Sequence, residues 1–436
     1  MHQRSFTRRN MLKASAATVA APMFVPAAAL GKDGAVAPSE RIVMGAIGTG
    51  GRGKFDMQWL LQSSQVQLVA ICDVQQVNRD NARQLVDKVH GNGDCAVFTD
   101  MRELLGRQDI DAVLIATGDR WHGPASIAAM EAGKDVYCEK PSTMSIAEGQ
   151  AVARCAEQTG RMYQTGTQRV SDFRFVFATE LAKRGLLGEL HTVRAHLWPA
   201  VKDVTYNEIL PVEPLPKREV IDWGQWIGQS PDRPYNSVYH RGGYACGAWG
   251  RFWDFGTGVA GWLAHTGLQC QFAVGRESSS PVHYANPGNK SGDGMVCTFD
   301  HGVKMVLQFE GGWRGTCGVR FEGTDGWVSI ADDYTRPDVS DNALLRHMQP
   351  IVDDYKQTTG RTLNHMQDFL DCVKSRRQPI ANAAVMHRTM TTNHAVNLCL
   401  HLGRDLRWDP TAEQFIDDAE ANAQRARDEM RDPWSG

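Results

Sequence analysis

Short apolar runs alternate with helical stretches between about residues 41 and 165. Residues 149–159 have the pattern of a helix, and apolar runs that predict strands lie at 41–47, 66–73, 111–117, 134–141 and 162–168. Strands that are apolar throughout and alternate with helices are typical of a parallel sheet covered on both faces. We therefore expect an α/β fold that begins with a doubly wound parallel sheet, in a Rossmann domain over residues 40–165.

The pattern changes after residue 165. Alternating strands separated by turn residues are predicted over 190–200 and 295–331, whereas residues 200–260 are rich in Pro, Gly and Trp and predict long irregular loops. Helical patterns follow over 363–375, 385–402 and the polar stretch 417–431. We expect a second, mainly antiparallel sheet in a C-terminal α/β domain that spans residues 166–436 and ends in helices.

Composition limits the classes of partner and of metal site. The 436 residues suffice for two domains, and a net charge of −3 argues against nucleic acid or an anionic membrane surface as partner. The ten cysteines include no CxxC pair, and several lie in apolar runs, which favours buried free thiols over disulfides. The fourteen histidines form no HxH or HExxH group, so no metal site is predicted.

The strongest local motif lies at the end of the first predicted strand. Gly48-x-Gly50-x-x-Gly53 has the spacing of a dinucleotide-binding turn, in which glycines permit a tight turn and close approach of the backbone to a pyrophosphate. The next strand ends in Asp73, twenty positions after Gly53. A carboxylate there accepts hydrogen bonds from a ribose 2′-OH and repels a 2′-phosphate, so the sequence favours NAD over NADP.

The N-terminus has the pattern of an export signal. Arg8 and Arg9 precede an apolar, alanine-rich run that is broken by Pro22 and Pro26, and residues 27–29 offer a small-residue cleavage site. We expect residues 1–31 to be a twin-arginine signal that engages the twin-arginine (Tat) export machinery. The folded protein would then reach the periplasm, which lacks a pool of soluble nicotinamide cofactor, so NAD should travel with the enzyme and be recycled on it.

Three motifs in order resemble the Gfo/Idh/MocA family, named for glucose–fructose oxidoreductase and inositol dehydrogenase. They are the glycine turn, the stretch 116–122 (ATGDRWH) and Glu139-Lys140-Pro141; the stretches 221–228, 321–327 and 407–410 look like an exported bacterial branch. The resemblance implies a large, open C-terminal sheet, a site between the domains, a sugar or polyol substrate and a homo-oligomer, either dimer or tetramer.

Lys140 is the first catalytic candidate, because it would lie at the carboxyl end of a parallel strand. Its ammonium can hydrogen-bond a substrate hydroxyl while hydride leaves the carbon; the alternative is a surface salt bridge with Glu139. The resemblance also suggests a cis bond before Pro141. The predicted cofactor-binding residues are Gly48, Thr49, Gly50, Gly51, Arg52, Gly53, Asp73, Thr117, Trp121, His122, Glu139, Lys140 and Gln168.

His265 is the second catalytic candidate, as a base for the alcohol proton. Many relatives carry Asp-x-Gly-x-His, and the matching segment here is Gly261-Trp-Leu-Ala-His265, in which glycine replaces the acid. His265 could instead be a core histidine, and Asp254 could supply the missing carboxylate from a loop. The predicted substrate-binding residues are Arg169, Tyr239, His240, Asp254 and Trp262.

Three functions compete on this evidence. The leading hypothesis is an NAD(P)-dependent oxidoreductase that transfers hydride between a tightly held nicotinamide cofactor and the CH–OH group of a sugar, a polyol or a derivative. The second is a redox-neutral glycoside hydrolase or epimerase that acts through a transient 3-keto sugar, and the replacement of the acid by Gly261 fits such a remodelled site. The third is a binding protein whose catalytic site has decayed.

Overall fold

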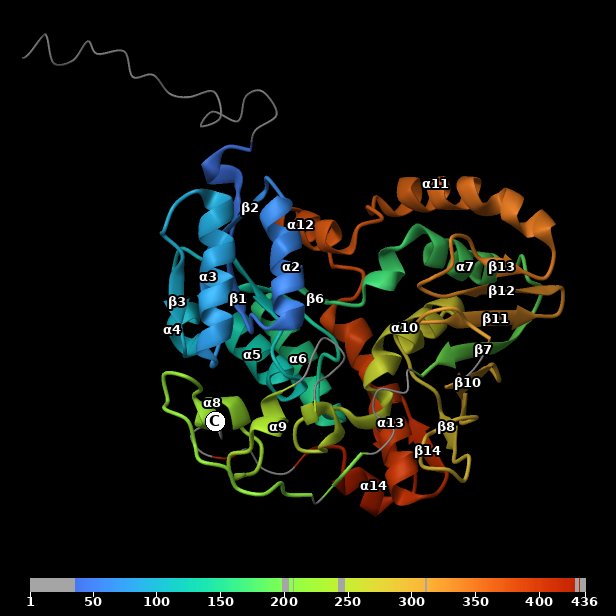
Figure 1. The fold of residues 1–436 in the computed structure, drawn as a ribbon. Coiled ribbons are helices and arrows are strands. Elements are labelled where there is room, and N and C mark those ends of the chain that lie inside the picture. Colours follow the sequence, from blue (N-terminus) through green and yellow to red (C-terminus); the bar gives the residue numbers. More distant parts are fainter. Residues whose placement is uncertain are drawn as a thin grey trace, which may run out of the picture.

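Figure 1 shows a computed structural model of the chain, which describes residues 36–197, 204–206, 208–241, 248–309, 312–427 and 431. The predicted signal over residues 1–31 lies outside the described residues. The first half forms a sheet with helices on both faces, and the second half forms a larger sheet with helices against one face. The α/β fold with an N-terminal Rossmann sheet and a second sheet domain is confirmed.

The N-terminal sheet has six parallel strands in the order β3-β2-β1-β4-β5-β6. This order places the ends of β1 and β4 side by side at the point where the winding reverses, which is where doubly wound sheets bind ligands. The strands are β1 (Ile42–Ile47), β2 (Val66–Cys72), β3 (Ala96–Phe98), β4 (Ala112–Ile115), β5 (Asp135–Cys138) and β6 (Tyr163–Thr165). The helices are α2 (Gly51–Gln62), α3 (Gln76–His90), α4 (Met101–Leu105), α5 (Asp119–Glu131) and α6 (Ile146–Thr159).

The second sheet has nine strands in the order β13-β12-β11-β7-β10-β9-β8-β14-β15. Only β7 and β10 pair in parallel, so the sheet is mainly antiparallel, as expected. Its strands are β7 (Leu190–His196), β8 (His283–Ala285), β9 (Val296–Thr298), β10 (Lys304–Gln308), β11 (Val319–Gly323), β12 (Gly326–Ile330), β13 (Asp338–Val339), β14 (Leu406–Asp409) and β15 (Gln414–Phe415).

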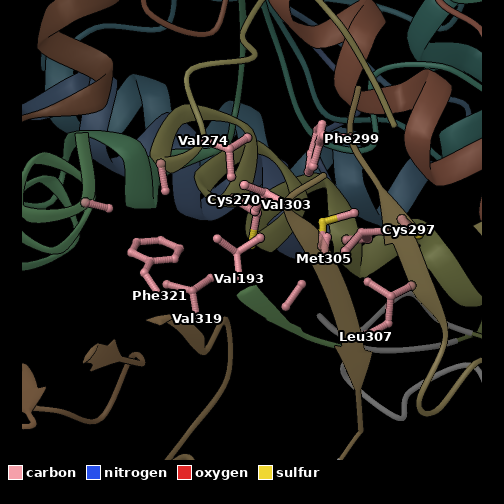
Figure 2. Close-up of a cluster of buried hydrophobic side chains, with 14 of the residues drawn as sticks. Val193, Cys270, Val274, Cys297, Phe299, Val303, Met305, Leu307, Val319 and Phe321 are labelled. Atoms are coloured by element: carbon pink, nitrogen blue, oxygen red, sulfur yellow. The ribbon is translucent and has the colours of Figure 1, made fainter. Parts of the chain in front are cut away.

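Helices cover one face of this sheet, and the apolar positions of the strands point toward them (Figure 2). Val193, Met305, Val319 and Phe321 alternate with polar neighbours along their strands and are buried against α10, where Cys270 lies. The covering helices are α7 (Phe173–Lys183), α10 (Leu263–Ala273), α11 (Met348–Thr359) and α13 (Ala383–Leu402). The period-two burial therefore explains why these residues form a one-sided sheet.

The opposite face of the sheet carries charged side chains. Arg194 on β7 and Arg320 on β11 both form ion pairs with Glu322, at 2.9 and 2.7 Å. This part of the face is therefore polar. The predicted homo-oligomer, if it uses this face, would therefore pack charged and polar groups rather than an apolar sheet.

Residues 204–262 form the predicted irregular region, apart from the gaps at 207 and 242–247. Short helices α8 (Trp223–Ile227), α9 (Ser237–His240), η5 (Ala248–Arg251) and η6 (Gly258–Trp262) follow one another, and η3 (Gln168–Ser171) precedes α7. A separate aromatic core holds the region together; its members include Trp223, Trp226, Tyr235, Tyr239, Phe252 and Phe255. Two tryptophans of this Trp-rich region, Trp223 and Trp226, thus serve packing.

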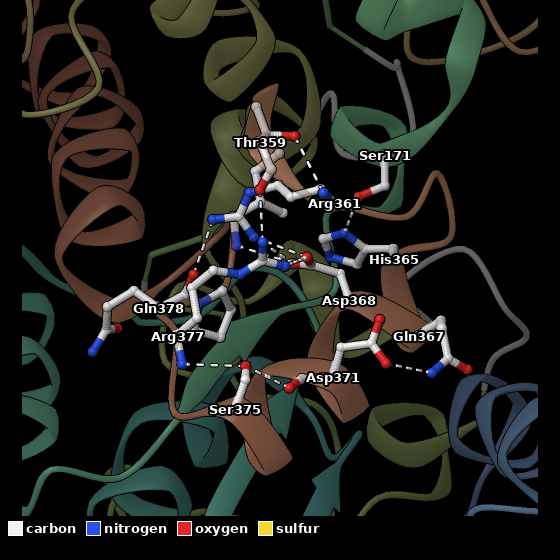
Figure 3. Close-up of polar contacts among 12 residues, drawn as sticks. Ser171, Thr359, Arg361, His365, Gln367, Asp368, Asp371, Ser375, Arg377 and Gln378 are labelled. Atoms are coloured by element: carbon white, nitrogen blue, oxygen red, sulfur yellow. Dashed lines mark hydrogen bonds and ion pairs between the residues drawn. The ribbon is translucent and has the colours of Figure 1, made fainter. Parts of the chain in front are cut away.

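The helix α12 (His365–Ser375) returns to the Rossmann sheet. Its residues Met366, Phe369 and Leu370 join the core beneath β1 and β4, and Phe369 lies edge-on to Tyr137. Polar contacts fix its two ends (Figure 3): Asp368 accepts from Arg361 at 2.8 Å and pairs with Arg377. The C-terminal part of the chain therefore supports the N-terminal sheet directly.

The polar stretch 417–431 was predicted to be helical and is so only in part. Asp417 adopts a left-handed conformation, Asp418 caps α14 (Ala419–Ala423), and the helix then ends. Ala421 is the one buried residue of this helix, so the segment has almost no apolar stripe that packing could use to hold further turns. The prediction of a long terminal helix is wrong.

The nine described cysteines are buried and unpaired, which confirms the expectation of buried free thiols for this part of the chain. Among the described residues, none of the helices has the length and apolar character that crossing a membrane requires. The same residues contain no group of three or more His, Cys, Asp or Glu side chains placed to hold a metal ion.

Candidate active site

A cavity of about 590 Å³ is lined by residues of both domains. It extends from Asp73 at the end of β2 to His265 on α10, and both catalytic candidates line it. The other predicted residues along its wall are Gly48, Gly50, Gly51, Arg52, Thr117, Trp121, His122, Glu139, Gln168, Arg169, His240 and Trp262. Residues from distant parts of the chain thus form one site.

Two glycines of the turn, Gly48 and Gly53, are packed too closely for a side chain. Gly48 has φ +80°, and a Cβ atom there would lie 2.6 Å from the backbone nitrogen of Thr117. A Cβ on Gly53 would collide with the carbonyl oxygen of Gly48. Gly50 begins α2 without a side-chain cap, so the first N–H groups of the helix are available to a phosphate. The turn therefore fits the pyrophosphate of a dinucleotide.

Asp73 is fully buried beside this turn. One carboxylate oxygen accepts from the backbone N–H of Thr49 at 2.8 Å and the amide of Asn78 at 3.2 Å, and the other accepts from the N–H of Gln75 at 2.9 Å. Burial raises the pKa of Asp73, and these hydrogen bonds oppose the rise. Thr49 does not line the cavity, so it serves to orient the acid that does.

A segment of the second domain closes over the edge of the sheet next to Asp73. The N–H of Gln76 donates to the carbonyl of Val220 at 2.9 Å, and the N–H of Asp222 donates to Val74 at 3.0 Å. The Arg79 guanidinium spans the junction, with 2.8 Å to the carbonyl of Asp73 and 2.7 Å to that of Glu219. We call residues 217–222 the clasp, because they tie the loop region to the adenosine end of the expected cofactor site.

His240 extends the same junction. Its Nδ1 lies 3.1 Å from the amide oxygen of Gln75, and its Nε2 lies 2.9 Å from the hydroxyl of Tyr235. Its place on the cavity wall is thus on the cofactor side, near the clasp. Burial and the neighbouring Arg241 hold the pKa of His240 below its usual value.

Glu139 forms its ion pair with Arg52, not with Lys140. The Arg52 guanidinium lies 2.8 Å from Glu139 and 2.7 Å from Asp56. Gln168 also donates to Glu139, at 2.9 Å. Burial and repulsion from Glu139 raise the pKa of Asp56 well above its usual value. The alternative of a surface salt bridge between Glu139 and Lys140 is therefore wrong.

Lys140 follows β5 and precedes a cis peptide bond to Pro141, as expected. Its ammonium lies 4.1 Å from the centroid of the Trp262 ring, a cation–π contact that couples the two domains. Within the described part of the chain, no oxygen accepts a hydrogen bond from this ammonium. Its donors therefore remain available to a ligand in the cavity.

His122 holds two backbone segments together. Its Nδ1 lies 2.6 Å from the carbonyl oxygen of Pro141 and its Nε2 lies 3.2 Å from that of Thr117. His122 thus fixes the loop after β4 against the residue that follows Lys140.

His265 lies on the first turn of α10 and is buried. Its Nδ1 has no hydrogen-bond partner within the described part of the chain, and its ring lies edge-on to Trp262 with the centroids 5.7 Å apart. Burial, followed by the positive charges of Arg169 and Lys140, lowers the pKa of His265 well below its usual value. The imidazole is therefore neutral at rest and can accept a proton.

Both halves of the chain match one family. Residues 42–167 match the description "Oxidoreductase family, NAD-binding Rossmann fold", and residues 198–436 match "Oxidoreductase family, C-terminal alpha/beta domain". The chain belongs to the Gfo/Idh/MocA family. This membership supports a nicotinamide cofactor, and the glycine turn described above fits one.

Among curated relatives of this Gfo/Idh/MocA protein are a glycosyl hydrolase family 109 protein of Shewanella baltica and an alpha-N-acetylgalactosaminidase of Shewanella oneidensis. Each is 32% identical over 206 residues, which cover 42% of this chain and 44% of the relative. The chain thus spans less than half the length of these curated relatives.

Solved structures share the fold. An oxidoreductase domain protein from Kribbella flavida superposes with a TM-score of 0.57 at 17% identity, over 87% of this chain and 100% of that one. An aldose-aldose oxidoreductase from Caulobacter crescentus, complexed with glycerol, gives 0.54 at 16% identity, over 84% and 99%. A putative myo-inositol dehydrogenase from Sinorhizobium meliloti gives 0.53 at 17%, over 84% and 99%. At such identities the likeness is one of fold alone.

Two of the predicted substrate residues of the Gfo/Idh/MocA protein lie away from the cavity. Tyr239 is fully buried in the aromatic core, and its hydroxyl accepts from the N–H of Leu210 at 2.9 Å. Asp254 forms an ion pair with Arg233 and lines a different cavity. Both expectations are corrected: the folded loop turns these side chains inward, so Asp254 does not supply the carboxylate that Gly261 lacks.

Arg169 keeps its expected place, with an unexpected partner. Its guanidinium binds both carboxylate oxygens of Asp332, at 2.9 and 2.8 Å, and all these groups face the cavity beside Thr316. Sequence reasoning missed Asp332, Thr316 and also Asp119, which lies at the start of α5. Asp119 had a signal that could have been used, since it stands within the 116–122 motif.

Proposed function

We propose that this protein is an NAD-dependent oxidoreductase that oxidises or reduces a CH–OH group of a sugar, a polyol or a derivative, with the cofactor tightly held. One observation carries the proposal. Lys140 from the Rossmann domain and His265 from the second domain line the same cavity as the glycine turn that fits a dinucleotide. An ammonium donor and a neutral imidazole are the two groups that alcohol oxidation requires.

Lys140 and His265 have different roles in the proposed reaction. When bound, NAD supplies the acceptor for the hydride that leaves the carbon. The Lys140 ammonium donates a hydrogen bond to the substrate oxygen and stabilises negative charge on it as the O–H proton departs. His265 takes that proton, so the substrate loses a hydride and a proton and gains a carbonyl bond. In the reverse direction His265 returns the proton.

Two features support a retained cofactor and a preference for NAD over NADP. The clasp closes over the sheet edge beside Asp73, so release of a dinucleotide would require its hydrogen bonds to open. The buried carboxylate of Asp73 disfavours a second negative charge next to it. The twin-arginine pattern of Arg8 and Arg9 supports export to the periplasm, where a retained cofactor would be needed.

Replacement of Lys140 tests the proposal. Lys140→Ala should lower turnover by roughly 100- to 10,000-fold, because the transition state loses its hydrogen-bond donor. The nucleotide content of the purified protein is measured alongside, so that lost chemistry can be told from lost cofactor. Lys374→Ala, which removes a surface ammonium bonded to Gln65, is the matched control. The measurement is the absorbance of reduced nicotinamide in purified protein after addition of myo-inositol or D-glucose. Full activity of Lys140→Ala would overturn this role.

A second candidate is a redox-neutral glycoside hydrolase. The 32% identical relatives named as glycosyl hydrolases favour it, and the glycine at position 261 fits a site that differs from that of the simple dehydrogenases. In this case an aryl α-N-acetylgalactosaminide would release its phenol without lasting reduction of bound nucleotide. Phenol release that stops when the nucleotide is stripped would favour this candidate; lasting nucleotide reduction by a free sugar would favour the first.

A further inference from the structure

The cavity contains a buried carboxylate that the mechanism above does not use. Asp119 is the first residue of α5, is 5% exposed, and lines the cavity together with Lys140 and His122. One of its oxygens, Oδ2, accepts two hydrogen bonds at 3.0 Å, from the backbone N–H and from the hydroxyl of Thr257. No donor in the described part of the chain reaches the other oxygen, Oδ1.

Thr257 holds this carboxylate near Gly261, the position where relatives with Asp-x-Gly-x-His carry an acid. A Cβ atom on Gly261 would lie 2.5 Å from the Thr257 hydroxyl oxygen, so that hydroxyl fills the space into which a side chain at position 261 would extend. Asn397 on α13 donates to the carbonyl of Thr257 and so holds this turn from behind. Position 261 lies one helical turn before His265, so Asp119 is held beside the turn that leads to the proposed base.

The place of Oδ1 on the cavity wall explains what a ligand would have to supply. A substrate that fills the cavity displaces water from this oxygen, and that displacement costs free energy unless the substrate brings its own donor. The positive charge of the Lys140 ammonium acts on Asp119 and offsets part of that cost. A sugar hydroxyl, which always carries a proton to donate, would satisfy the remaining oxygen.

We propose that Asp119 is a substrate-binding carboxylate, held by Thr257, whose Oδ1 accepts a hydrogen bond from a hydroxyl of the sugar or polyol next to Lys140. The inference rests on the proposed function and identifies the substrate class more narrowly, as a polyhydroxy compound with a second hydroxyl close to the one that reacts. The carboxylate thus comes from the Rossmann domain, whereas the relatives with Asp-x-Gly-x-His carry it on the segment of the base.

Three variants test this inference on the nucleotide-loaded protein. Asp119→Asn should lower kcat/KM for myo-inositol or D-glucose by roughly 10- to 100-fold, chiefly through KM, since a hydrogen bond to a charged group is lost. Thr257→Val removes the hydroxyl that holds Asp119 and should also lower kcat/KM. Thr257→Ser keeps a hydroxyl at this position and should have a kcat/KM close to that of the wild type. Asp254→Asn is the matched control, because its carboxylate pairs with Arg233 outside this cavity.

Binding is measured separately from turnover, as the rise in Tm that saturating myo-inositol, D-glucose or N-acetylgalactosamine gives the loaded protein. Asp119→Asn should lose most of this rise in Tm while its nucleotide content stays unchanged. The double variant Asp119→Asn, Thr257→Val should show almost the same rise in Tm as Asp119→Asn alone, because both changes remove the same interaction. A wild-type rise retained in Asp119→Asn overturns the inference. Wild-type protein that binds a probe but never reduces its nucleotide would contradict the proposed function alone, and wild-type protein that binds no probe contradicts both.

Discussion

The buried histidines of this protein differ in whether both of their ring nitrogens have hydrogen-bond partners. His365 at the start of α12 is satisfied on both sides. It accepts from the hydroxyl of Ser171 at 2.9 Å (Figure 3), and it donates to the carbonyl of Thr165 at 2.7 Å. His265 has an unpartnered Nδ1 and faces the cavity. The first histidine therefore stabilises the fold, whereas the second is available for chemistry.

We predict that His365 makes the protein less stable as the pH falls. Burial lowers the pKa of His365 to about 4, whereas an unfolded histidine has a pKa of about 6.5. Between about pH 6.5 and pH 4 this histidine is protonated in the unfolded chain but stays neutral in the folded chain. The free energy of unfolding therefore has its full value above about pH 6.5 and decreases as the pH falls to about 4. The cost over this window is roughly 3 kcal/mol.

Urea unfolding of His365→Gln and of the wild type at several pH values checks this prediction. The variant should be less stable at pH 7 but should lose less stability between pH 6.5 and pH 4. His347→Gln, a change at the half-buried histidine that ends the 3-10 helix η7 (Asn342–His347), serves as the control and should follow the wild type. Parallel curves for His365→Gln and the wild type would show that His365 does not cause the loss.

At the scale of elements, the clasp connects segments that are far apart in sequence. Residues 217–222 pair with the junction between β2 and α3, and the isolated bridge between Gln75 and Ile221 belongs to the same contact. Arg79 reaches both sides of it from α3. Because the junction adjoins Asp73, the stability of this contact should set the rate at which a dinucleotide leaves.

We predict that Arg79→Met speeds the release of bound NAD by roughly tenfold or more, since two hydrogen bonds from a charged group are lost. The release rate can be followed by trapping free nucleotide after dilution of the loaded protein. Arg83→Met on the same helix removes a surface ion pair with Asp87 and should leave the rate unchanged. Equal release rates for the two variants would show that the clasp does not hold the cofactor.

For the whole molecule, the cavity requires both domains to be in place, because its two ends lie in different domains. The supporting contacts do not follow the order of the chain: α12 packs on the Rossmann sheet, and Arg376 after it binds Asp135 at the start of β5 at 2.5 Å. None of the nine described cysteines forms a disulfide that joins these parts. Packing and hydrogen bonds alone therefore hold the arrangement together.

We predict that a reducing agent leaves the stability of the protein unchanged, whereas removal of the nucleotide lowers it. Reduction has no disulfide to break among the described cysteines, but a ligand that binds only the folded state stabilises that state by mass action. Thermal unfolding with and without dithiothreitol, and before and after the nucleotide is stripped, measures both effects. A lower Tm in dithiothreitol would contradict the first, and equal Tm values for loaded and stripped protein would contradict the second.

The sequence by itself determined the Rossmann half of this protein and one end of its site. The hydrophobic periodicity, the spacing of the glycines and the position of a residue at a strand end are local properties of the chain. The turn at Gly48 and the positions of Asp73 and Lys140 could therefore be predicted from the residues next to them in sequence. The alternating strands in the second half likewise indicated a mainly antiparallel sheet. In each case the signal and the structure lie within a few residues of each other.

Only the tertiary structure decided which distant side chains meet in the cavity. Asp254 and Tyr239 looked available in a polar, aromatic loop, but the aromatic core and Arg233 turn them inward. Asp119 and Asp332 were not singled out, because their partners Thr257 and Arg169 are more than a hundred residues away. Burial and pairing are set by packing between elements, and no local pattern in the chain encodes that packing.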